Sequence, residues 1–232
     1  MFSYYGSKRQ LAHHYAEPQY DLIVEPFAGS AGYSLHGDRW QKDVLLLDRD
    51  TRLVGVWEWL IGEATRAAIL ALPELRVGET STEFLSIASV ATRTVNSLST
   101  TVVTPSMVAA WEQSRSYLAA DISKIKHWHV RSGEYADAPD VAATWFVDPP
   151  YEGGVGDGYV FGSLTLDYVR LANWIRSRTG QTIACESGVA GYLPFEPLRA
   201  GTDKPGDSHA EFIWSNQPHV DVAGFRSSST ES

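Results

Sequence analysis

The chain has 232 residues, 44% of them hydrophobic, so it can bury one sizeable core, and a single domain over 1–232 with an insertion is favoured over two domains. Its formal net charge of −9 counts against a large non-specific nucleic-acid surface, because phosphate binding depends on lysine and arginine. No apolar run approaches the ~20 residues that span a bilayer, and the N-terminus lacks a signal peptide's apolar core, so we expect a cytoplasmic protein with no membrane partner.

The first apolar strand is expected at residues 20–24, after an opening YYGSK segment that says little by itself, and it ends at Glu25. The loop that follows is built from small residues, which let a ligand approach the backbone at the carboxyl edge of a parallel sheet. Its spacing is neither that of GxGxxG nor that of a phosphate-binding loop, so a dinucleotide or a triphosphate is disfavoured. Glu25 instead indicates a ligand with a cationic group, such as an α-amino group.

The second strand, residues 44–47, runs into Asp48, about twenty residues after the small-residue loop. An acid at this distance is the one that binds ribose hydroxyls in nucleotide-binding α/β folds. Asp50 has a plainer interpretation as the N-cap of a helix that starts near Thr51. The sequence therefore favours ligand contact for Asp48 and helix capping for Asp50.

An insertion is expected between the second and third strands, at residues 73–121. Helical spacing of apolar residues predicts one helix over 83–98 and another from Pro105. Such an insertion would lie over the carboxyl edge, where it is a candidate target-recognition element. The alternative is an embellishment that only packs against the core.

The third and fourth strands are expected at residues 127–130 and 142–147, and the fourth stops at Asp148, Pro149, Pro150 and Tyr151. Each proline removes a backbone N–H, so the strand cannot continue. The Asp148 carboxylate and the Pro149 carbonyl can accept both hydrogens of an exocyclic amino group, while Tyr151 offers a flat face for the ring that carries it. The pattern predicts a site for the amino group of a base; the alternative is an ordinary Pro-Pro turn.

Glycine-rich residues 152–159 predict a mobile flap, and a helix containing Tyr168 is expected to end at Gly180. A fifth strand is expected at residues 181–185, where Cys185 is a buried core residue. Residues 211–214 and 220–223 are expected to supply hairpin strands, and 226–232 a disordered tail. Alternation of strands and helices indicates an α/β sheet.

Any DNA-binding face on so acidic a chain must be local. Basic and aromatic residues interleave in KIKHWHVR at residues 124–131. The candidate phosphate contacts are Lys124, Lys126, Arg131, Arg176 and Arg178. The alternative is a solvated run of residues ahead of a strand.

Two stretches at the carboxyl ends of different strands, EPFAGSAG at 25–32 and DPPY at 148–151, together resemble the S-adenosylmethionine-dependent amino-methyltransferases that act on DNA. With YYGSK, LLLDRD, KIKHWHVRSGEY and GQTIACESGVAGYLPF, the chain resembles more closely the short adenine-N6 DNA methyltransferases often encoded by phages and related to the Dam-type enzymes. The resemblance implies a Rossmann-like methyltransferase fold with a mostly parallel sheet of about seven strands, a C-terminal antiparallel hairpin and a small helical insertion. It also implies a phage or restriction-modification context in a bacterial host cell.

By position, the resemblance implies that Tyr4, Tyr5 and Lys8 border the cofactor, S-adenosylmethionine. Its methionine part would be held by Glu25, Pro26, Phe27, Ala28, Gly29 and Ser30. Asp48 would bind the ribose, and Glu134 would lie near the adenine ring. Asp148, Pro149, Pro150 and Tyr151 would hold a flipped target base, with Asp148 also beside the cofactor. The chain has Ala31 where many relatives have glycine, and Glu134 where aspartate is commoner.

The implied activity is methyl transfer to the N6 amine of adenine in DNA, by base flipping and without a metal. An N4-cytosine enzyme would use the same chemistry, but serine is the commoner first residue of its tetrad. A protein-glutamine or RNA methyltransferase is a further alternative, although the enzymes that act on glutamine usually have asparagine as the first residue of this tetrad. A catalytically silent DNA- or cofactor-binding relative is disfavoured, because Lys8, Glu25, Asp48 and Asp148 are all retained.

Overall fold

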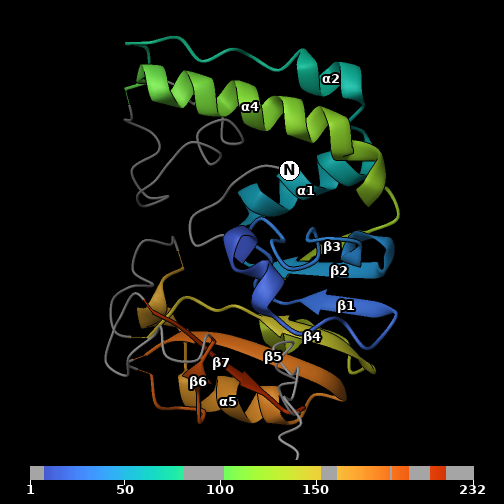
Figure 1. The fold of residues 1–232 in the computed structure, drawn as a ribbon, viewed down its shortest axis with the longest axis vertical. Helices are drawn as coiled ribbons and strands as arrows, with labels where there is room; N and C mark the ends of the chain where they lie inside the picture. The colour runs from blue at the N-terminus through green and yellow to red at the C-terminus, as the bar shows by residue number, and fades with distance from the viewer. Residues whose placement is uncertain (1–7, 81–101, 153–160, 189, 199–209, 218–232) are drawn as a thin grey trace, which may run out of the picture.

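The structure, a computed structural model, describes residues 8–80, 102–152, 161–188, 190–198 and 210–217. Its strands form one seven-stranded sheet in the order β3-β2-β1-β4-β5-β7-β6 (Figure 1). The strands are β1 Leu22–Glu25, β2 Asp43–Asp48, β3 His129–Ser132, β4 Ala143–Val147, β5 Gly180–Ser187, β6 Glu196–Pro197 and β7 Glu211–Ser215. β1 to β5 pair in parallel, whereas β7 pairs antiparallel with both β5 and β6. The expected α/β class, with a mostly parallel sheet and a C-terminal antiparallel hairpin, is confirmed and is compatible with a Rossmann-like fold.

The strand order reverses at the centre of the sheet. From β1 the chain builds β2 and β3 on one side, and then β4 and β5 on the other. β1 and β4 are neighbours there, through Ile23 opposite Thr144 and Val24 opposite Trp145. Open α/β sheets bind ligands beyond the carboxyl ends of the strands at such a reversal. Glu25, the last residue of β1, and Asp148, directly after β4, both lie at this point.

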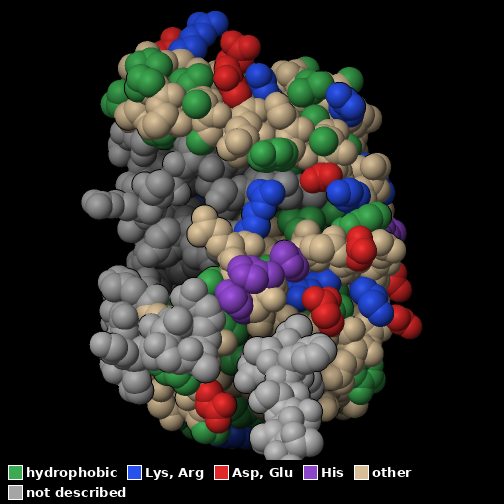
Figure 2. All heavy atoms as spheres, viewed as in Figure 1, with side chains coloured by type: hydrophobic (Ala, Val, Ile, Leu, Met, Phe, Trp, Pro, Cys, Tyr) green, Lys and Arg blue, Asp and Glu red, His purple; other side chains and the backbone are tan. Residues whose placement is uncertain are grey.

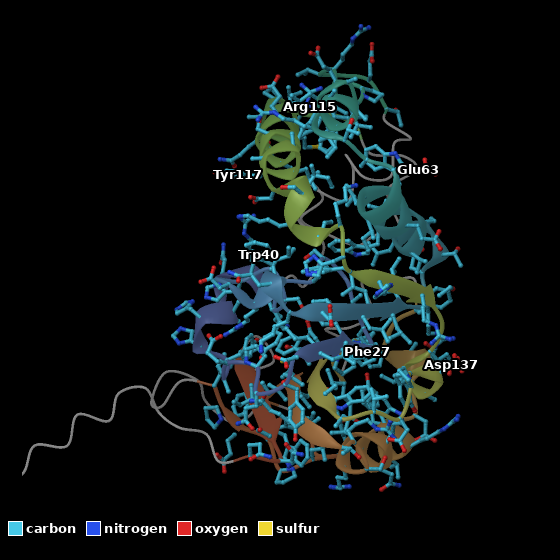
Figure 3. All side chains as sticks on the ribbon, turned by 90° about the vertical axis from the view of Figure 1, so that its right-hand side faces the viewer. Phe27, Trp40, Glu63, Arg115, Tyr117 and Asp137 are labelled. Carbon is cyan, nitrogen blue, oxygen red and sulfur yellow. The ribbon has the colours of Figure 1, made fainter. Side chains whose placement is uncertain are left out.

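Both faces of the central strands β1 and β4 are buried, which explains why these strands are near-continuous apolar runs, whereas β3 at the edge of the sheet is largely exposed. Alternate residues contribute to two separate cores. The first contains Ile23, Leu46, Phe146 and Ile183 with Trp57 of α1 (Thr51–Gly62), and the second contains Val24, Leu47, Trp145 and Ala184 with Leu171 of α5 (Tyr168–Arg176). Figure 3 shows Trp40 and Phe27, which pack against the first and second core respectively, on opposite sides of the sheet.

Two helices, α1 and α4, begin where the sequence predicts. Asp50 caps α1, since its side chain accepts a hydrogen bond from the Arg52 N–H at 3.0 Å. α4 (Pro105–Asp121) starts at the predicted proline and lies beside α2 (Arg66–Leu70) at one end of the molecule (Figure 1). The expected helix over 83–98 lies outside the described residues. Among the described helices, none is both long and apolar enough to cross a membrane.

Two contacts bind α4 to the segment after α2, both through side-chain donors on backbone carbonyls. The Trp111 indole donates to Pro73 O at 2.9 Å, and the Arg115 guanidinium donates to Leu72 O at 2.8 Å. Figure 3 shows Arg115 and Tyr117 on this part of the molecule. Short 3₁₀ helices connect the larger elements: η1 Lys8–Gln10, η2 Ala12–His14, η3 Arg39–Gln41, η5 Ile122–Ile125, η6 Tyr135–Asp137 and η8 Ser163–Thr165.

Several boundaries and one strand pairing differ from the prediction; β1, for example, begins at Leu22 and not at residue 20. β3 begins at His129 and not at residue 127, because the Trp128 N–H donates to Ile125 O, which closes a turn after η5. α5 ends at Arg176, and Gly180 starts β5 with φ +107°, in the left-handed region that favours glycine. The described hairpin partner of β7 is β6, which precedes it in the chain. Residues 220–223, most of the expected flap and the tail lie outside the described residues.

Candidate functional site

The carboxyl edge of the sheet gathers acidic side chains from four strands or their ends. Glu25 ends β1, Asp48 ends β2, Asp148 follows β4, and Glu211 begins the antiparallel β7. Glu211 reaches the same edge because it pairs with Ser187, the last residue of β5. Parallel register therefore brings together Glu25, Asp48 and Asp148, which the sequence predicted as site residues.

Glu25 is buried, with 2% of its surface exposed. The Ser34 N–H donates to Glu25 Oε1 at 2.9 Å, and the Ser34 hydroxyl donates to the same oxygen. Burial raises the pKa of Glu25 to about 7, although the Ser34 hydrogen bonds oppose this effect. Among the described residues no hydrogen-bond donor is assigned to the second carboxylate oxygen, which could therefore accept from a cationic ligand group.

The loop after β1 is held against β2 by its backbone. The Ala28 N–H donates to Leu47 O at 2.9 Å, and the Gly29 N–H donates to Asp48 Oδ2 at 3.2 Å. The Trp57 indole of α1 donates to Gly29 O at 3.0 Å. Gly29 and Ala31 have φ of 48° and 51°, and left-handed backbone is costly for alanine, so glycine would be the less strained residue at position 31. The loop is thus a fixed backbone surface at the edge.

Asp48 and Asp50 have different surroundings: the predicted helix cap at Asp50 is confirmed, and ligand contact at Asp48 stays a prediction. Asp48 accepts the N–H groups of Gly29 and Asp50, and burial raises its pKa to about 6. The Asp50 carboxylate accepts the Arg52 N–H as the helix cap. It also forms a bidentate ion pair with the Arg52 guanidinium, at 2.9 and 2.7 Å. Asp50 is therefore a structural residue, and Asp48 is the acid that supports the loop.

The DPPY residues lie beside the N-terminal segment. The Lys8 ammonium is 3.1 Å from Asp148 Oδ1, and it lies 4.3 Å from the centre of the Tyr151 ring. Burial raises the pKa of Asp148 to about 6, although the Lys8 ammonium opposes this effect. The Pro150 carbonyl accepts the Tyr168 hydroxyl at 2.7 Å, which ties the end of the tetrad to α5. Pro149, which lies between Asp148 and Pro150 in the sequence, is buried.

A glutamate that the sequence did not single out completes the cluster. Glu211 accepts hydrogen bonds from the Tyr151 hydroxyl, 2.8 Å from each carboxylate oxygen, and from the Tyr15 hydroxyl at 2.7 Å. Its Oε2 is 3.5 Å from the Lys8 ammonium. The signal in the sequence was a lone acid at the start of the apolar EFIW strand. We name Lys8, Asp148, Tyr151 and Glu211 the DPPY cluster.

A second contact explains how Lys8 is held at the edge. A side-chain carbon placed on Gly32 would lie 3.0 Å from Arg9 N and 3.1 Å from Lys8 N, so η1 rests directly on this glycine. Arg9 in turn lies over the Tyr117 ring of α4, with its guanidinium carbon 5.6 Å from the ring centre. The insertion therefore touches the segment that carries Lys8. Its role as a recognition element stays a prediction.

The remaining residues predicted to bind the cofactor differ in burial and in position. Pro26, Ala28 and Ser30 are buried in the loop, and Phe27 stacks on Tyr135 with ring centres 5.7 Å apart. The side chain of Glu134 is half exposed and lies 3.5 Å from the Arg49 guanidinium. Glu134 is thus placed near the end of β3 but outside the buried cluster. Tyr4 and Tyr5 lie outside the described residues.

Four of the five basic candidates lie on the other edge of the sheet. Lys124 and Lys126 precede β3, and Arg176 and Arg178 precede β5, so all four are at the amino ends of parallel strands. Lys126 donates to Leu60 O at 2.8 Å and Ala64 O at 2.6 Å, which closes the end of α1. The structure therefore does not bring these cations to the edge that carries Asp148.

The other contacts of these cations are with neighbouring side chains and carbonyls. Lys124 pairs with Asp121, Arg178 lies over Trp174, and Arg176 donates to Tyr192 O at 3.3 Å. Arg131 is exposed within β3. On the face in Figure 2, described Lys and Arg side chains lie among acidic and apolar ones, and histidine side chains gather near the middle.

In the part of the chain that the structure describes, no three His, Cys, Asp or Glu side chains are placed to hold a metal ion. Cys185 is buried, as expected for a core residue. Comparison with known protein families and with curated proteins found no match for this chain.

Proposed function

We propose that this chain transfers a methyl group from S-adenosylmethionine to the N6 amino group of adenine in DNA. The observation that carries the proposal is the meeting of Glu25, Asp48 and Asp148 at the reversal of strand order. Glu25 is buried, Asp48 and Asp148 are half-buried, and all three have a raised pKa, so each favours a ligand that brings a positive charge or hydrogen-bond donors.

The donor and acceptor set suits S-adenosylmethionine. Glu25 has one oxygen held by Ser34 and one left for an α-ammonium group. Asp48 holds the Gly29 backbone at the position where ribose hydroxyls are bound in related α/β folds. When bound, S-adenosylmethionine would supply a methyl group on a positively charged sulfur. A nucleoside triphosphate fits poorly, because four acids would repel its phosphates.

Asp148 is the residue proposed to act on the target amine. Its carboxylate would accept an N–H of the amino group, which leaves the nitrogen lone pair free to form the new N–C bond while the C–S bond breaks and sulfur keeps its electron pair. The methylated nitrogen then carries a positive charge and one proton too many. The Asp148 carboxylate is the acceptor in contact with that nitrogen, and it would take the proton.

Tyr151 is proposed to orient the base. Its hydroxyl is held by Glu211, and one region of its ring is occupied by the Lys8 ammonium, so the ring cannot turn freely. A base taken out of the duplex loses its stacking, and contact with an aromatic face recovers about 1–3 kcal/mol of that loss. The tetrad thus combines an acceptor with a fixed ring.

The test pairs methyl transfer with cofactor binding on the same preparations. Asp148→Ala should lower methylation of adenine-containing duplexes by orders of magnitude, because an acceptor used in the transition state is lost. Tyr151→Ala should cost less. S-adenosylmethionine affinity, titrated by calorimetry, should change little in either variant.

The products decide between this proposal and its alternatives. Nucleoside analysis of the DNA should find N6-methyladenine. Methylation of cytosine alone by the parent chain, or cofactor binding without any transfer to DNA, would overturn the assignment. So would near-parent production of N6-methyladenine by Asp148→Ala.

A further inference from the structure

The Lys8 ammonium lies between two carboxylates of the DPPY cluster. It is 3.1 Å from Asp148 Oδ1 and 3.5 Å from Glu211 Oε2. The side chains of Lys8 and Glu211 are each only 9% exposed, so neither charge is well solvated. An ammonium in such surroundings must keep a carboxylate partner, because an unpaired buried charge is strongly destabilising.

This arrangement creates a conflict with the proposed reaction. The ammonium lies 3.1 Å from Oδ1 of Asp148, so it interacts with the same carboxylate that a substrate amino group would donate to. A neutral amine is a weaker partner for a carboxylate than a lysine ammonium is. Substrate binding is therefore favoured when the ammonium moves away from Asp148 and keeps ionic contact with another carboxylate.

We propose that Glu211 is a positioning residue that takes over the Lys8 ammonium when a substrate amino group binds Asp148. The inference rests on the proposed function and adds to it a residue outside the DPPY tetrad. The two carboxylates lie at nearly equal distances from the ammonium, so a small rotation of the lysine side chain exchanges one partner for the other. Asp148 is then free to accept the amine.

Glu211 is suited to this role because its carboxylate is fixed without help from Lys8. The Tyr15 hydroxyl, from the segment before β1, and the Tyr151 hydroxyl both donate to it. Its backbone is set by the pairing of β7 with β5. A carboxylate held from three directions stays in place while the ammonium moves.

The same contacts couple substrate position to the lysine. The ammonium that approaches Glu211 also stays over the Tyr151 ring, at 4.3 Å from its centre in the present arrangement. Glu211 holds the hydroxyl of that ring. The residue thus acts on the substrate only through Lys8 and Tyr151, and it is not itself in contact with the reacting atoms.

The experiment measures kcat and KM for adenine-containing duplexes at saturating S-adenosylmethionine. The variants are Glu211→Gln, Lys8→Met and the double substitution. Glutamine keeps an oxygen for the tyrosine hydroxyls but removes the negative charge. We expect Glu211→Gln to raise KM for DNA about tenfold in the parent chain. In the Lys8→Met background the same substitution should have less than about a third of that effect, because the effects of two residues in direct contact are not additive. Glu211→Asp, which keeps the charge, should restore part of the loss.

A matched control makes the same chemical change at another ion pair of the N-terminal region. Glu17 binds the Arg39 guanidinium at 2.8 and 3.1 Å, and among the described residues it forms no ion pair with Lys8. Glu17→Gln should leave KM and kcat near their parent values. Thermal unfolding of every variant separates loss of fold from loss of substrate binding.

Two results would overturn the inference. One is an equal KM effect of Glu211→Gln with and without Lys8, which would mean that Glu211 does not act through the ammonium. The other is a fall in kcat with unchanged KM that Glu211→Asp does not rescue. If the parent chain itself transfers no methyl group to adenine, the proposed function fails first, and this result is distinct from both.

Discussion

Glu25→Gln tests whether the buried, negatively charged carboxylate of this site lowers the folding stability of the protein. Ser34 donates from both its N–H and its hydroxyl to one oxygen, Oε1. Glutamine can keep that oxygen and place its amide nitrogen at the other position, so the shape of the site is preserved. What changes is the charge, which burial makes unfavourable.

The magnitude follows from the pKa of Glu25, which burial raises from 4.5 to about 7. At ~1.4 kcal/mol per pH unit, the ionised carboxylate lowers folding stability by roughly 3 kcal/mol. The folded protein keeps the Glu25 proton to a higher pH than the unfolded chain does. Its stabilising contribution is therefore fully present below pH 4.5 and is lost as the pH rises through about 7.

Urea unfolding of the parent and the variant at pH 4.5 and pH 8 measures this effect. The two proteins should have similar stability at the lower pH, and Glu25→Gln should be more stable at pH 8 by up to roughly 3 kcal/mol. Calorimetry on the same samples should show weaker S-adenosylmethionine binding by the variant. If the variant and the parent were equally stable at both pH values, the assignment of a charge destabilised by burial to Glu25 would be refuted.

Glu17→Gln is the control, and its effect on stability should have the opposite sign to that of Glu25→Gln. A hydrogen bond from Arg39 lowers the pKa of Glu17, so its contribution is present above pH 4.5 and is lost as the pH falls further. Glu17 is largely exposed, and surface ion pairs contribute only about 0–1 kcal/mol. Glu17→Gln should therefore be slightly less stable than the parent at pH 8. A gain in stability for both variants would point to net charge, and not to burial, as the cause.

Three further predictions follow from the contacts of the site. Gly32→Ala should lower methylation and thermal stability together, because its methyl group must displace the η1 backbone that carries Lys8; unchanged kinetics would contradict that support. Asp50→Ala should destabilise the protein by about 0.5–2 kcal/mol as a lost helix cap while Asp48→Ala weakens cofactor binding, and calorimetry should separate the two. Lys126→Ala should lower stability by about 1 kcal/mol through the end of α1 and leave DNA affinity nearly unchanged, whereas a large loss of affinity would show that the amino edge binds DNA.

The local parts of the fold were predictable because they depend on neighbours in sequence. A carboxylate before a helix, as at Asp50, and a proline at its first turn, as at Pro105, fix a helix start within a few residues. Apolar runs that end in acids or prolines mark the carboxyl ends of parallel strands. The positions of Glu25, Asp48 and Asp148 at one edge follow from these patterns together with parallel pairing.

The parts that were missed depend on pairing between distant segments. Glu211 reaches Lys8 and Tyr151 only because β7 turns back antiparallel beside β5, and no local pattern encodes that register. For the basic candidates near Lys124 the residues were identified from the sequence, but their place in the fold was not. Interleaved basic and aromatic residues were visible in the sequence, but the edge on which they lie is fixed by the direction of β3. Charge patterns identify residues, and topology decides which of them meet.

The acidity of the carboxyl edge is consistent with action on DNA only in a particular geometry. Glu25, Asp48, Asp148 and Glu211 would repel phosphates, and across a Debye length of about 8 Å that repulsion is not fully screened. A neutral base and a positively charged cofactor can approach these acids, whereas the DNA backbone cannot come equally close. A base that leaves the duplex satisfies this condition, because extrusion separates it from the phosphates that flank it. The proposed reaction therefore requires base flipping on electrostatic grounds as well as on steric ones, and phosphate contacts must come from cations that lie away from the DPPY cluster.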